Sequence, residues 1–463
     1  MKNVLVFFPR EKPMLNLSKG VDLAGLGKLL GVNIAYLSNK RTDLFNIPMD
    51  KLEHFESSWS KRDETIFFDS LYIASWLRNK NPALRHLLRV RILGNEPMKV
   101  RYLAKIFRNL FYRLRAIKLF SQMRVFKEPP EVLLENLRRK GIVSSNDRAI
   151  FEDILLKSMV DSVIICSTLK DATTYDLLSA AKKLSIPTSI LVDSWDNIGT
   201  APAIPDISRC LLLWSNQQLD EINIYFPEFA NRAQIIGSTK RSDIIRAKKA
   251  YILQSKIKKG KTLQQSKFNV LYIQAYFNDD TIHTLVNLRD VFKNLIEECS
   301  IDIRVTVRRY PFPSPSNKSL FNIRDNVFSE MRHTALEFCE SKEENILHDI
   351  LHADLVLSEI SSGGLEAIFA EKPIIFIFSN HKEAFLTGKK ILDFKFASDL
   401  LSHYKIVLNT DKMMLKRTLE RYLPPRMDSS TLLINEVPVD KSKPRGDSYF
   451  GEDFNLEKLK EAL

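Results

Sequence analysis

Two serines and two glycines in a row, Ser361-Ser362-Gly363-Gly364, are the residues of this 463-residue chain best suited to hold an anion. They follow a short apolar run, Leu355–Leu357, and a helical pattern begins directly after them. Hydroxyl groups, glycines and the unbonded N–H groups of a helix start can cradle a pyrophosphate. The same residues could equally form a plain strand-to-helix turn with a serine N-cap. The sequence leaves both interpretations open.

A second polar loop follows the predicted strand Thr188–Val192. It contains Asp193, Trp195, Asp196 and Asn197. Two carboxylates, an amide and an indole beyond a buried strand suit an acceptor site in which Asp193 or Asp196 is the general base. The alternative is a polar loop whose Asp and Asn residues only cap a turn.

Two further loops carry cations after predicted strands. Strand Gln234–Ile236 leads into Gly237-Ser238-Thr239-Lys240-Arg241-Ser242-Asp243, and strand Ile301–Val307 leads into Arg308-Arg309-Tyr310-Pro311. Glycine, hydroxyl groups and arginines before a helix suit phosphate contacts by Ser238, Thr239, Arg241, Arg308 and Arg309. The alternatives are a helix cap at Asp243 and exposed surface arginines.

The elements that must position these loops alternate between strand and helix along the chain, and continuous apolar strands indicate a parallel sheet buried on both faces. Such sheets bind ligands at the carboxyl ends of their strands. We expect an N-terminal Rossmann-like acceptor domain over 1–245, a linker over 246–267, a C-terminal Rossmann-like nucleotide-donor domain over 268–430 and a polar tail with a short helix over 431–463. The further strands predicted are Val4–Phe8, Asn33–Leu37, Thr65–Phe68, Val163–Cys166, Cys210–Trp214, Asn269–Ile273, Ile374–Phe378 and Lys405–Leu408.

The positive charge of the chain is local. Basic residues exceed acidic ones by 69 to 56 overall, and residues 78–127 alone hold 14 basic residues against one acid, Glu96. This insertion contains neither proline nor glycine from Lys99 to Lys127 and repeats apolar residues at helical spacing, which predicts a basic amphipathic helix. Such a helix could lie on an anionic membrane surface, or could pack on its own domain and line a groove for an acidic acceptor. Its cations are Arg101, Lys105, Arg108, Arg115 and Lys118.

Several other classes of protein are disfavoured. No apolar run approaches the length of about 20 residues that a membrane-spanning helix needs, and no motif typical of nucleic-acid binding is present. Cys166, Cys210, Cys299 and Cys339 are scattered, which favours a reducing cytoplasm over disulfides or a cysteine metal site. We therefore expect a cytoplasmic protein, peripheral on the inner face of the plasma membrane if the basic helix binds lipid.

Taken together, these segments resemble the GT-B glycosyltransferases, in particular the bacterial surface-polysaccharide and CDP-glycerol glycerophosphotransferase-like enzymes. Those proteins carry a G-x-P-R-x-D element at the end of the first domain, which residues 237–243 resemble with one extra residue and no proline. They carry a basic residue and His-Pro where this chain has Arg308 to Pro311, so that Tyr310 replaces the histidine. Ser361-Ser362, Glu366 and Lys372-Pro373-Ile374 match the pattern of the donor domain.

The resemblance implies an α/β GT-B fold, two Rossmann-like domains facing across a cleft. It implies that Ser361, Ser362, Gly363 and Gly364 hold the donor phosphates and that Glu366 binds the ribose. Arg308 or Arg309 and Arg241 would offset the charge of the leaving nucleotide. Trp195 and Asn197 would contact the acceptor. No bound metal is expected, since the chain has no D-x-D motif, and His348 and His352 have helical i, i+4 spacing but no evident third ligand.

The leading hypothesis is therefore a glycosyltransferase that moves a sugar from a nucleotide-activated donor to a lipid-linked or polysaccharide acceptor in bacterial surface glycan synthesis. The alternatives are a CDP-glycerol-type glycerophosphotransferase, a nucleotide-sugar epimerase, and a non-catalytic module that binds a polyanion or a membrane.

Overall fold

The computed structural model describes residues 1–39, 52–79, 84, 87, 129–258, 267–274, 279–299, 301–309, 336–341, 345–378, 394–404, 406–408, 412–423, 449 and 451–463. The chain divides into two compact units. The N-terminal unit comprises Met1–Asp243, Asp393–Phe396 and Ser448–Leu463, and the C-terminal unit comprises Ile244–Leu392 and Ala397–Asp447. Each unit is built around one parallel β-sheet, which confirms the predicted α/β class with two Rossmann-like domains.

The N-terminal unit contains a seven-stranded sheet in the order β3-β2-β1-β4-β5-β6-β7, with every neighbouring pair parallel. The chain adds strands outward from β1 to β3 on one side and from β4 to β7 on the other, so the strand order reverses between β1 and β4. The strands are β1 (Asn3–Phe8), β2 (Asn33–Ser38), β3 (Leu52–His54), β4 (Ser162–Ser167), β5 (Thr188–Val192), β6 (Leu211–Leu213) and β7 (Ala233–Ile235).

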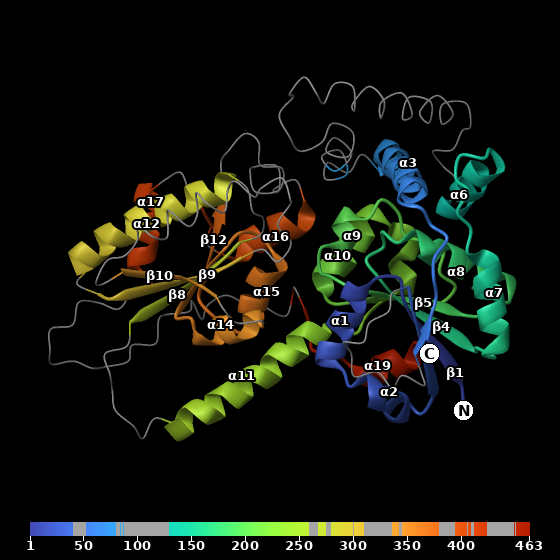
Figure 1. The fold of residues 1–463 in the computed structure, drawn as a ribbon, viewed down its shortest axis with the longest axis horizontal. Helices are drawn as coiled ribbons and strands as arrows, with labels where there is room; N and C mark the ends of the chain where they lie inside the picture. Colours follow the sequence, from blue (N-terminus) through green and yellow to red (C-terminus); the bar gives the residue numbers. More distant parts are fainter. Residues whose placement is uncertain are drawn as a thin grey trace. The chain divides into compact units, whose positions relative to one another are not determined.

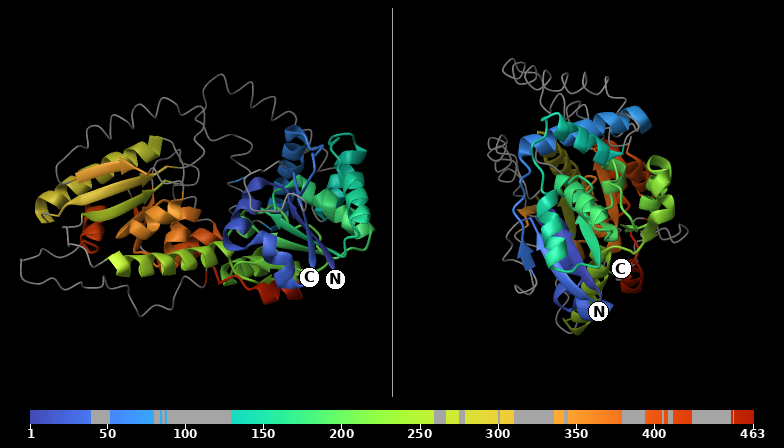
Figure 2. Two further views of the ribbon diagram at one scale, coloured as in Figure 1. Left: turned by 60° about the horizontal axis from the view of Figure 1, so that its bottom comes forward. Right: turned by 90° about the vertical axis from the view of Figure 1, so that its right-hand side faces the viewer.

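Helices cover both faces of this sheet (Figures 1 and 2). Alternate residues of β1 divide between the layers, since Val4 and Phe8 pack with α1, α2 and α19 while Leu5 and Phe7 pack with α7 and α8. A strand that is apolar on both sides is therefore buried on both sides, as its sequence predicts. The helices are α1 (Glu11–Gly20), α2 (Leu23–Leu30), α3 (Lys61–Asn79), α6 (Pro130–Arg139), α7 (Arg148–Lys157), α8 (Ala172–Lys183), α9 (Asn197–Thr200), α10 (Asn216–Tyr225), the 3₁₀ helix η3 (Pro227–Arg232) and α19 (Leu456–Glu461).

The C-terminal unit contains a six-stranded parallel sheet in the order β10-β9-β8-β11-β12-β13. Val270 and Tyr272 of β8 pack against α12 and α17, while Ile273 lies against α14 and α15 on the opposite face. The strands are β8 (Phe268–Ile273), β9 (Ile303–Arg308), β10 (Leu336–Glu340), β11 (Leu355–Ser358), β12 (Ile374–Phe378) and β13 (Ile406–Leu408). The helices are α11 (Thr239–Lys258), which begins in the N-terminal unit, α12 (Asp279–Cys299), α14 (Ile346–His352), α15 (Ser362–Phe369), α16 (Lys395–His403) and α17 (Lys412–Glu420).

One predicted strand is wrong. The stretch Thr65–Phe68 lies inside α3, where Phe67, Phe68, Leu71 and Tyr72 are buried. Their spacing of one, four and five residues is that of one helix face, and the short apolar run was too brief for its periodicity to distinguish a strand from a helix. The hydroxyl of Ser60 accepts a hydrogen bond from the N–H of Asp63 at 3.0 Å, at the start of this helix.

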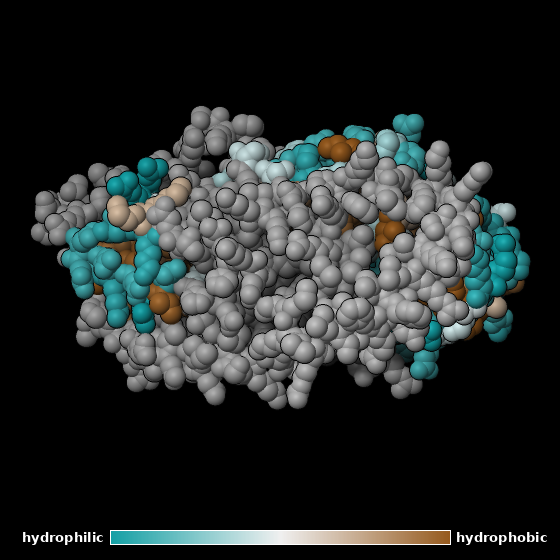
Figure 3. Space-filling model, turned by 90° about the horizontal axis from the view of Figure 1, so that it is seen from above, coloured by the Kyte–Doolittle hydropathy of each residue, from teal (hydrophilic) through white to brown (hydrophobic). Residues whose placement is uncertain are grey.

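No helix in the described part of the chain is long and apolar enough to cross a membrane. The described residues visible in Figure 3 are mostly hydrophilic, and the hydrophobic patches among them are small. The predicted basic helix, with Arg101, Lys105, Arg108, Arg115 and Lys118, lies outside the described residues.

Candidate functional site

The Ser361–Gly364 segment lies at the point where the strand order of the C-terminal sheet reverses. In the order β10-β9-β8-β11-β12-β13, connections leave β8 and β11 toward opposite sides, which opens a crevice at their carboxyl ends. Ile273 pairs with Ser358, so the residues that follow, Gln274 and Glu359, lie side by side at this edge. Helix α15 begins three residues later at Ser362. The predicted anion segment is thus located where open parallel sheets bind ligands.

The start of α15 has the geometry of a capped helix. The hydroxyl of Ser361 accepts a hydrogen bond from the N–H of Gly364 at 3.2 Å and lies 3.3 Å from the hydroxyl of Ser358. The first N–H groups of any helix lack intrahelical acceptors and carry the positive end of its dipole. Ser361 and Ser362 are only partly buried. Ser361 is therefore the N-cap of α15, and anion binding by the same turn stays a prediction.

The two glycines have a structural role. A Cβ atom on Gly364 would lie 2.8 Å from both Phe376 Cε1 and Ser358 Oγ, and one on Gly363 would lie 2.9 Å from Ile346 Cδ1. These neighbours belong to the same unit, so close packing of α15 on the sheet accounts for both glycines. Their presence does not by itself indicate a ligand.

The structure adds Gln274, which the sequence analysis did not select. Its side chain is 3% exposed, and neither its amide nitrogen nor its amide oxygen has a hydrogen-bond partner among the residues that the structure describes. Buried amides are almost always bonded, so such a group at a ligand-binding edge requires an explanation. The only signal in the sequence is that Gln274 is the first polar residue after an apolar strand.

The arginines expected to contact a diphosphate are paired with acids of their own unit. Arg308 donates to Asp349 Oδ2 at 3.3 Å and to Ser341 Oγ at 3.2 Å, and Arg309 forms an ion pair with Glu340. A phosphate that binds here would have to compete with these carboxylates. Tyr310 and Pro311 lie outside the described residues. Glu366 lies one turn into α15 and is partly exposed.

Lys372, from the Lys-Pro-Ile segment, caps a helix. Its amino group donates to the carbonyl groups of Leu351 and Ala353 at 2.8 Å each, at the carboxyl end of α14. Burial lowers the pKa of this amine, while the nearby carboxylate of Asp354 acts to raise it. A cation at a helix C-terminus satisfies carbonyls that have no other partner, so the lysine holds α14 beside the start of β12.

Asp193 is the most distinctive titratable group of the N-terminal unit. It directly follows β5 and is 6% exposed; its Oδ1 accepts a hydrogen bond from Asn16 Nδ2 at 2.8 Å, while Oδ2 has no hydrogen-bond partner in the described part of the chain. Burial raises the pKa of this carboxyl above its usual value, although the Asn16 bond and the charges of Lys12 and Lys240 act to lower it. A carboxylate with a raised pKa and one unbonded oxygen has the properties of a general base.

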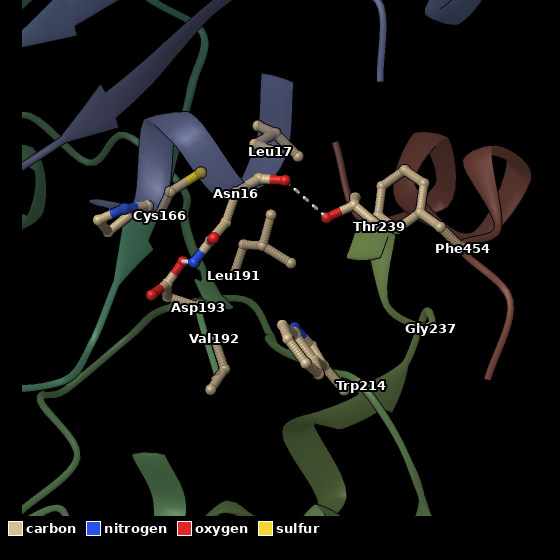
Figure 4. A pocket seen from close by; sticks show the side chains of 11 residues that line it. Asn16, Leu17, Cys166, Leu191, Val192, Asp193, Trp214, Gly237, Thr239 and Phe454 are labelled. Atoms are coloured by element: carbon tan, nitrogen blue, oxygen red, sulfur yellow. Dashed lines mark hydrogen bonds between the residues drawn. The ribbon is translucent and has the colours of Figure 1, made fainter. Parts of the chain in front are cut away.

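A small cavity lies in front of Asp193 (Figure 4). Its volume is about 10 Å³, enough for one water molecule at most. Asn16 from α1 and Trp214 and Thr239 from beyond β6 and β7 contribute to its lining. The site residues predicted at the ends of separate strands are therefore brought together at one edge of this sheet.

The other residues of the Asp193 loop are largely buried. Trp195 is 2% exposed, and its ring lies 4.8 Å from that of Phe396 in an edge contact. Asn197 is 5% exposed, and its Nδ2 has no hydrogen-bond partner within the described ranges. Asp196 is partly exposed and precedes the short helix α9. Of the two candidate bases, Asp193 is thus the buried one.

The Gly237-Ser238-Thr239 segment is covered by the C-terminal end of the chain. The N–H of Ser238 donates to the carbonyl of Glu452 at 2.8 Å, and Gly237 adopts φ 90° with its Cα facing the carbonyl of Asp453. Thr239 Oγ1 donates to the carbonyl of Asn16 at 3.2 Å. Ser238 therefore fastens the C-terminal segment to the sheet, and Thr239 bonds to α1.

Arg241 takes part in the same attachment. Its Nε donates to Asp453 Oδ1 at 2.9 Å, and the N–H of Phe454 donates to Ser242 Oγ at 3.0 Å. A role for Arg241 at a phosphate therefore needs this ion pair to exchange.

No group of three or more potential metal ligands occurs among the described residues. His348 and His352 of α14 stack with their ring centroids 4.1 Å apart, and His352 Nδ1 lies 2.8 Å from the carbonyl of His348. Tyr251 makes an edge contact with His352 at 4.9 Å. These histidines pack on α11 rather than converge on a third ligand within the described residues.

No family model and no curated protein matches this chain. Solved structures of similar fold include a UDP-GlcNAc 2-epimerase from Methanocaldococcus jannaschii (12% identity, 91% of this chain and 92% of that chain covered, TM-score 0.47). They also include a glycosyltransferase from Rickettsia africae (11%, 91% and 88%, TM-score 0.44) and an α,α-trehalose 6-phosphate synthase from Burkholderia multivorans (11%, 100% and 93%, TM-score 0.44). At these identities and scores the likeness says nothing about the activity of this chain.

Proposed function

We propose that this protein is a glycosyltransferase that uses a nucleotide-activated sugar as donor. The observation that carries the proposal is the edge of the C-terminal sheet at β8 and β11. There the N-terminus of α15, with two serines, follows β11, and the buried side chain of Gln274, whose amide has no hydrogen-bond partner among the described residues, follows the neighbouring strand β8. The helix start suits the donor phosphates, and Gln274 can both donate to and accept from the donor.

The N-terminal unit contributes the acceptor side in this proposal. Asp193 takes the proton of the attacking hydroxyl group, because its raised pKa and its unbonded Oδ2 suit a general base at neutral pH. Carbon–oxygen bond formation at the anomeric carbon then expels the nucleoside diphosphate with inversion. Glu366 binds the ribose, and Arg308 or Arg309 stabilises the departing phosphate once its carboxylate partner is released.

The proposed acceptor is a lipid-linked or polysaccharide glycan of the bacterial surface. The support for a membrane-bound acceptor is the basic amphipathic pattern between Lys99 and Lys127 in the sequence. In this proposal the protein acts in the cytoplasm at the inner face of the plasma membrane and needs no metal.

A thermal-shift screen of the full chain against UDP-, GDP-, CMP- and CDP-linked compounds tests the donor site. A ligand at about a hundred times its dissociation constant stabilises the native state by about 2.7 kcal/mol. Gln274→Leu and the double variant Glu366→Ala with Arg308→Ala should lose this stabilisation. Asp193→Asn should keep it, because Asp193 belongs to the acceptor side.

Binding that is unchanged in both donor-site variants would reject the proposal. Product analysis with the compound that binds then separates the reactions. Release of a nucleoside diphosphate upon transfer indicates a glycosyltransferase, release of CMP from CDP-glycerol indicates a glycerophosphotransferase, and epimerisation without an acceptor indicates an epimerase.

A further inference from the structure

Four side chains in the segments that follow β5 and β6 hold buried polar atoms that have no hydrogen-bond partner among the described residues. They are Asp193, Asn197, Ser215 and Gln217, which are 6%, 5%, 0% and 0% exposed. The unpartnered atoms are Oδ2 of Asp193, Nδ2 of Asn197, Oγ of Ser215 and both amide atoms of Gln217. Folded proteins leave few such atoms, and each one left unbonded destabilises the fold.

These side chains share one edge of the sheet. Asp193 and Asn197 follow β5, Ser215 and Gln217 follow β6, and the two strands pair in parallel. The adjacent Gln218 links the two loops, since its Nε2 donates to the carbonyl of Ser194 at 2.9 Å and its Oε1 accepts from the N–H of Trp214 at 2.6 Å.

Glu221 adds a second link between the loops, because its Oε2 accepts from the N–H of Gly199 at 2.9 Å. Gln217 and Glu221 lie one helical turn apart on α10, so Gln217 is on the face of that helix that is turned toward α9. These hydrogen bonds of Gln218 and Glu221 join the two loops, and Asn197, Ser215 and Gln217 belong to the segments that they join.

From this arrangement we infer that the edge formed by β5 and β6 binds a neutral, hydroxyl-rich ligand such as a saccharide, read by Gln217, Ser215 and Asn197. The inference rests on the proposed function, in which that ligand is the acceptor. Amide and hydroxyl groups offer both donors and acceptors, as sugar hydroxyls require. The one ionisable group of the four is the carboxyl of Asp193, which disfavours an anionic ligand in direct contact with the cluster.

To reach these side chains, the ligand displaces some of the residues that now bury them. The cavity beside Asp193 holds at most one water molecule, and a sugar ring is much larger. Binding is therefore coupled to an opening of this edge, and the fraction of open molecules reduces the apparent affinity. Unpartnered amides favour such an opening, because they gain hydrogen bonds when the ligand or water reaches them.

Two adjacent glutamines provide a matched test. Gln217→Leu removes the unpartnered amide, and Gln218→Leu removes the bonded one. The full chain is titrated with neutral mono- and disaccharides without nucleotide, using saturation-transfer NMR for weak binding, and with inorganic phosphate as the anionic probe. Thermal unfolding is recorded for each variant.

The expected result is saccharide binding by the parent chain, weakened about tenfold in Gln217→Leu, whose melting temperature is equal to or above that of the parent. Gln218→Leu should melt at a lower temperature. The inference is overturned if no neutral saccharide binds, if Gln217→Leu binds as the parent does, or if only phosphate binds. It is also overturned if Gln217→Leu melts at a lower temperature than the parent, which would show that this amide stabilises the fold.

Nucleotide-sugar binding, measured separately, reports on the donor site. If the parent chain binds a nucleotide-sugar but no neutral saccharide, this inference is rejected and the proposed function is left standing. The reverse result would reject the proposed donor site.

Discussion

The substitution Gly364→Ala tests whether the glycines of the donor segment exist for packing. The added Cβ would lie 2.8 Å from Phe376 Cε1 and from Ser358 Oγ, and both of these side chains are fully buried. Carbon contacts are optimal at about 3.5–4.0 Å, so the neighbours must move by more than about half an ångström. Overpacking of this kind costs about 1–3 kcal/mol. Alanine in place of glycine in a helix returns up to about 1 kcal/mol.

The net expectation for Gly364→Ala is a loss of about 1–2 kcal/mol in the free energy of unfolding. For a unit of this size the loss lowers the melting temperature by about 2–8 °C. The measurement is urea and thermal unfolding of the full chain, with hydrogen exchange at the amides of α15 to locate the effect. Gly363→Ala is the control. Its added Cβ meets the side-chain ends of Ile346 and Ile273 at 2.9 and 3.0 Å, which can rotate away, so the loss should be smaller.

The sign of the change in the free energy of unfolding decides whether packing explains the glycine at position 364. If Gly364→Ala is as stable as the parent or more stable, the position has room for a side chain. The packing explanation would then be refuted, and the glycine would have to be explained by the approach of a ligand.

Three further predictions concern the charged residues. Burial raises the pKa of Asp193 in the folded chain, so the ionised carboxylate destabilises the fold once the pH rises through that pKa. Asp193→Asn should therefore increase the free energy of unfolding at pH 7 and bring no increase below about pH 3.9. Urea titrations at both pH values measure this difference. An increase that is equal at both pH values would contradict this assignment. Lys372→Met should lower the free energy of unfolding by about 1.5–3 kcal/mol, because two carbonyls at the end of α14 lose a charged donor. The affinity for a nucleotide-sugar, measured by calorimetry, should not change. A large loss of affinity would place the amine at the ligand instead. The full chain should sediment with vesicles of anionic lipid at low salt and be released at high salt, because salt screens electrostatic attraction beyond a Debye length of about 8 Å near physiological salt. Neutralising Arg101, Lys105 and Arg108 together should weaken this sedimentation. Sedimentation that does not depend on salt would argue against membrane binding by the basic helix.

The alternation of apolar strands with helices was sufficient to predict the fold class. Ile374–Phe378 is apolar at every position and Thr188–Val192 at its last three, and the structure places both inside parallel sheets with helices on either face. The short run Thr65–Phe68 carried too little periodicity, and tertiary packing made it part of α3. The attachment of residues 451–463 to β7 could not be foreseen, because the contacting backbone groups are more than two hundred residues apart in sequence.

For the candidate site, the sequence by itself determined which residue types stand at strand ends: the serines before α15, Asp193 after β5 and the arginines after β9. These positions follow from local hydrophobic patterns, which depend on near neighbours alone. Only the tertiary structure decided which polar groups are already bonded. It joined Arg241 to Asp453 and Arg308 to Asp349, and it left the amides of Gln274 and Gln217 buried without hydrogen-bond partners among the described residues. Hydrogen bonding depends on distance in space and on desolvation, and neither quantity is encoded in the spacing of residues along the chain.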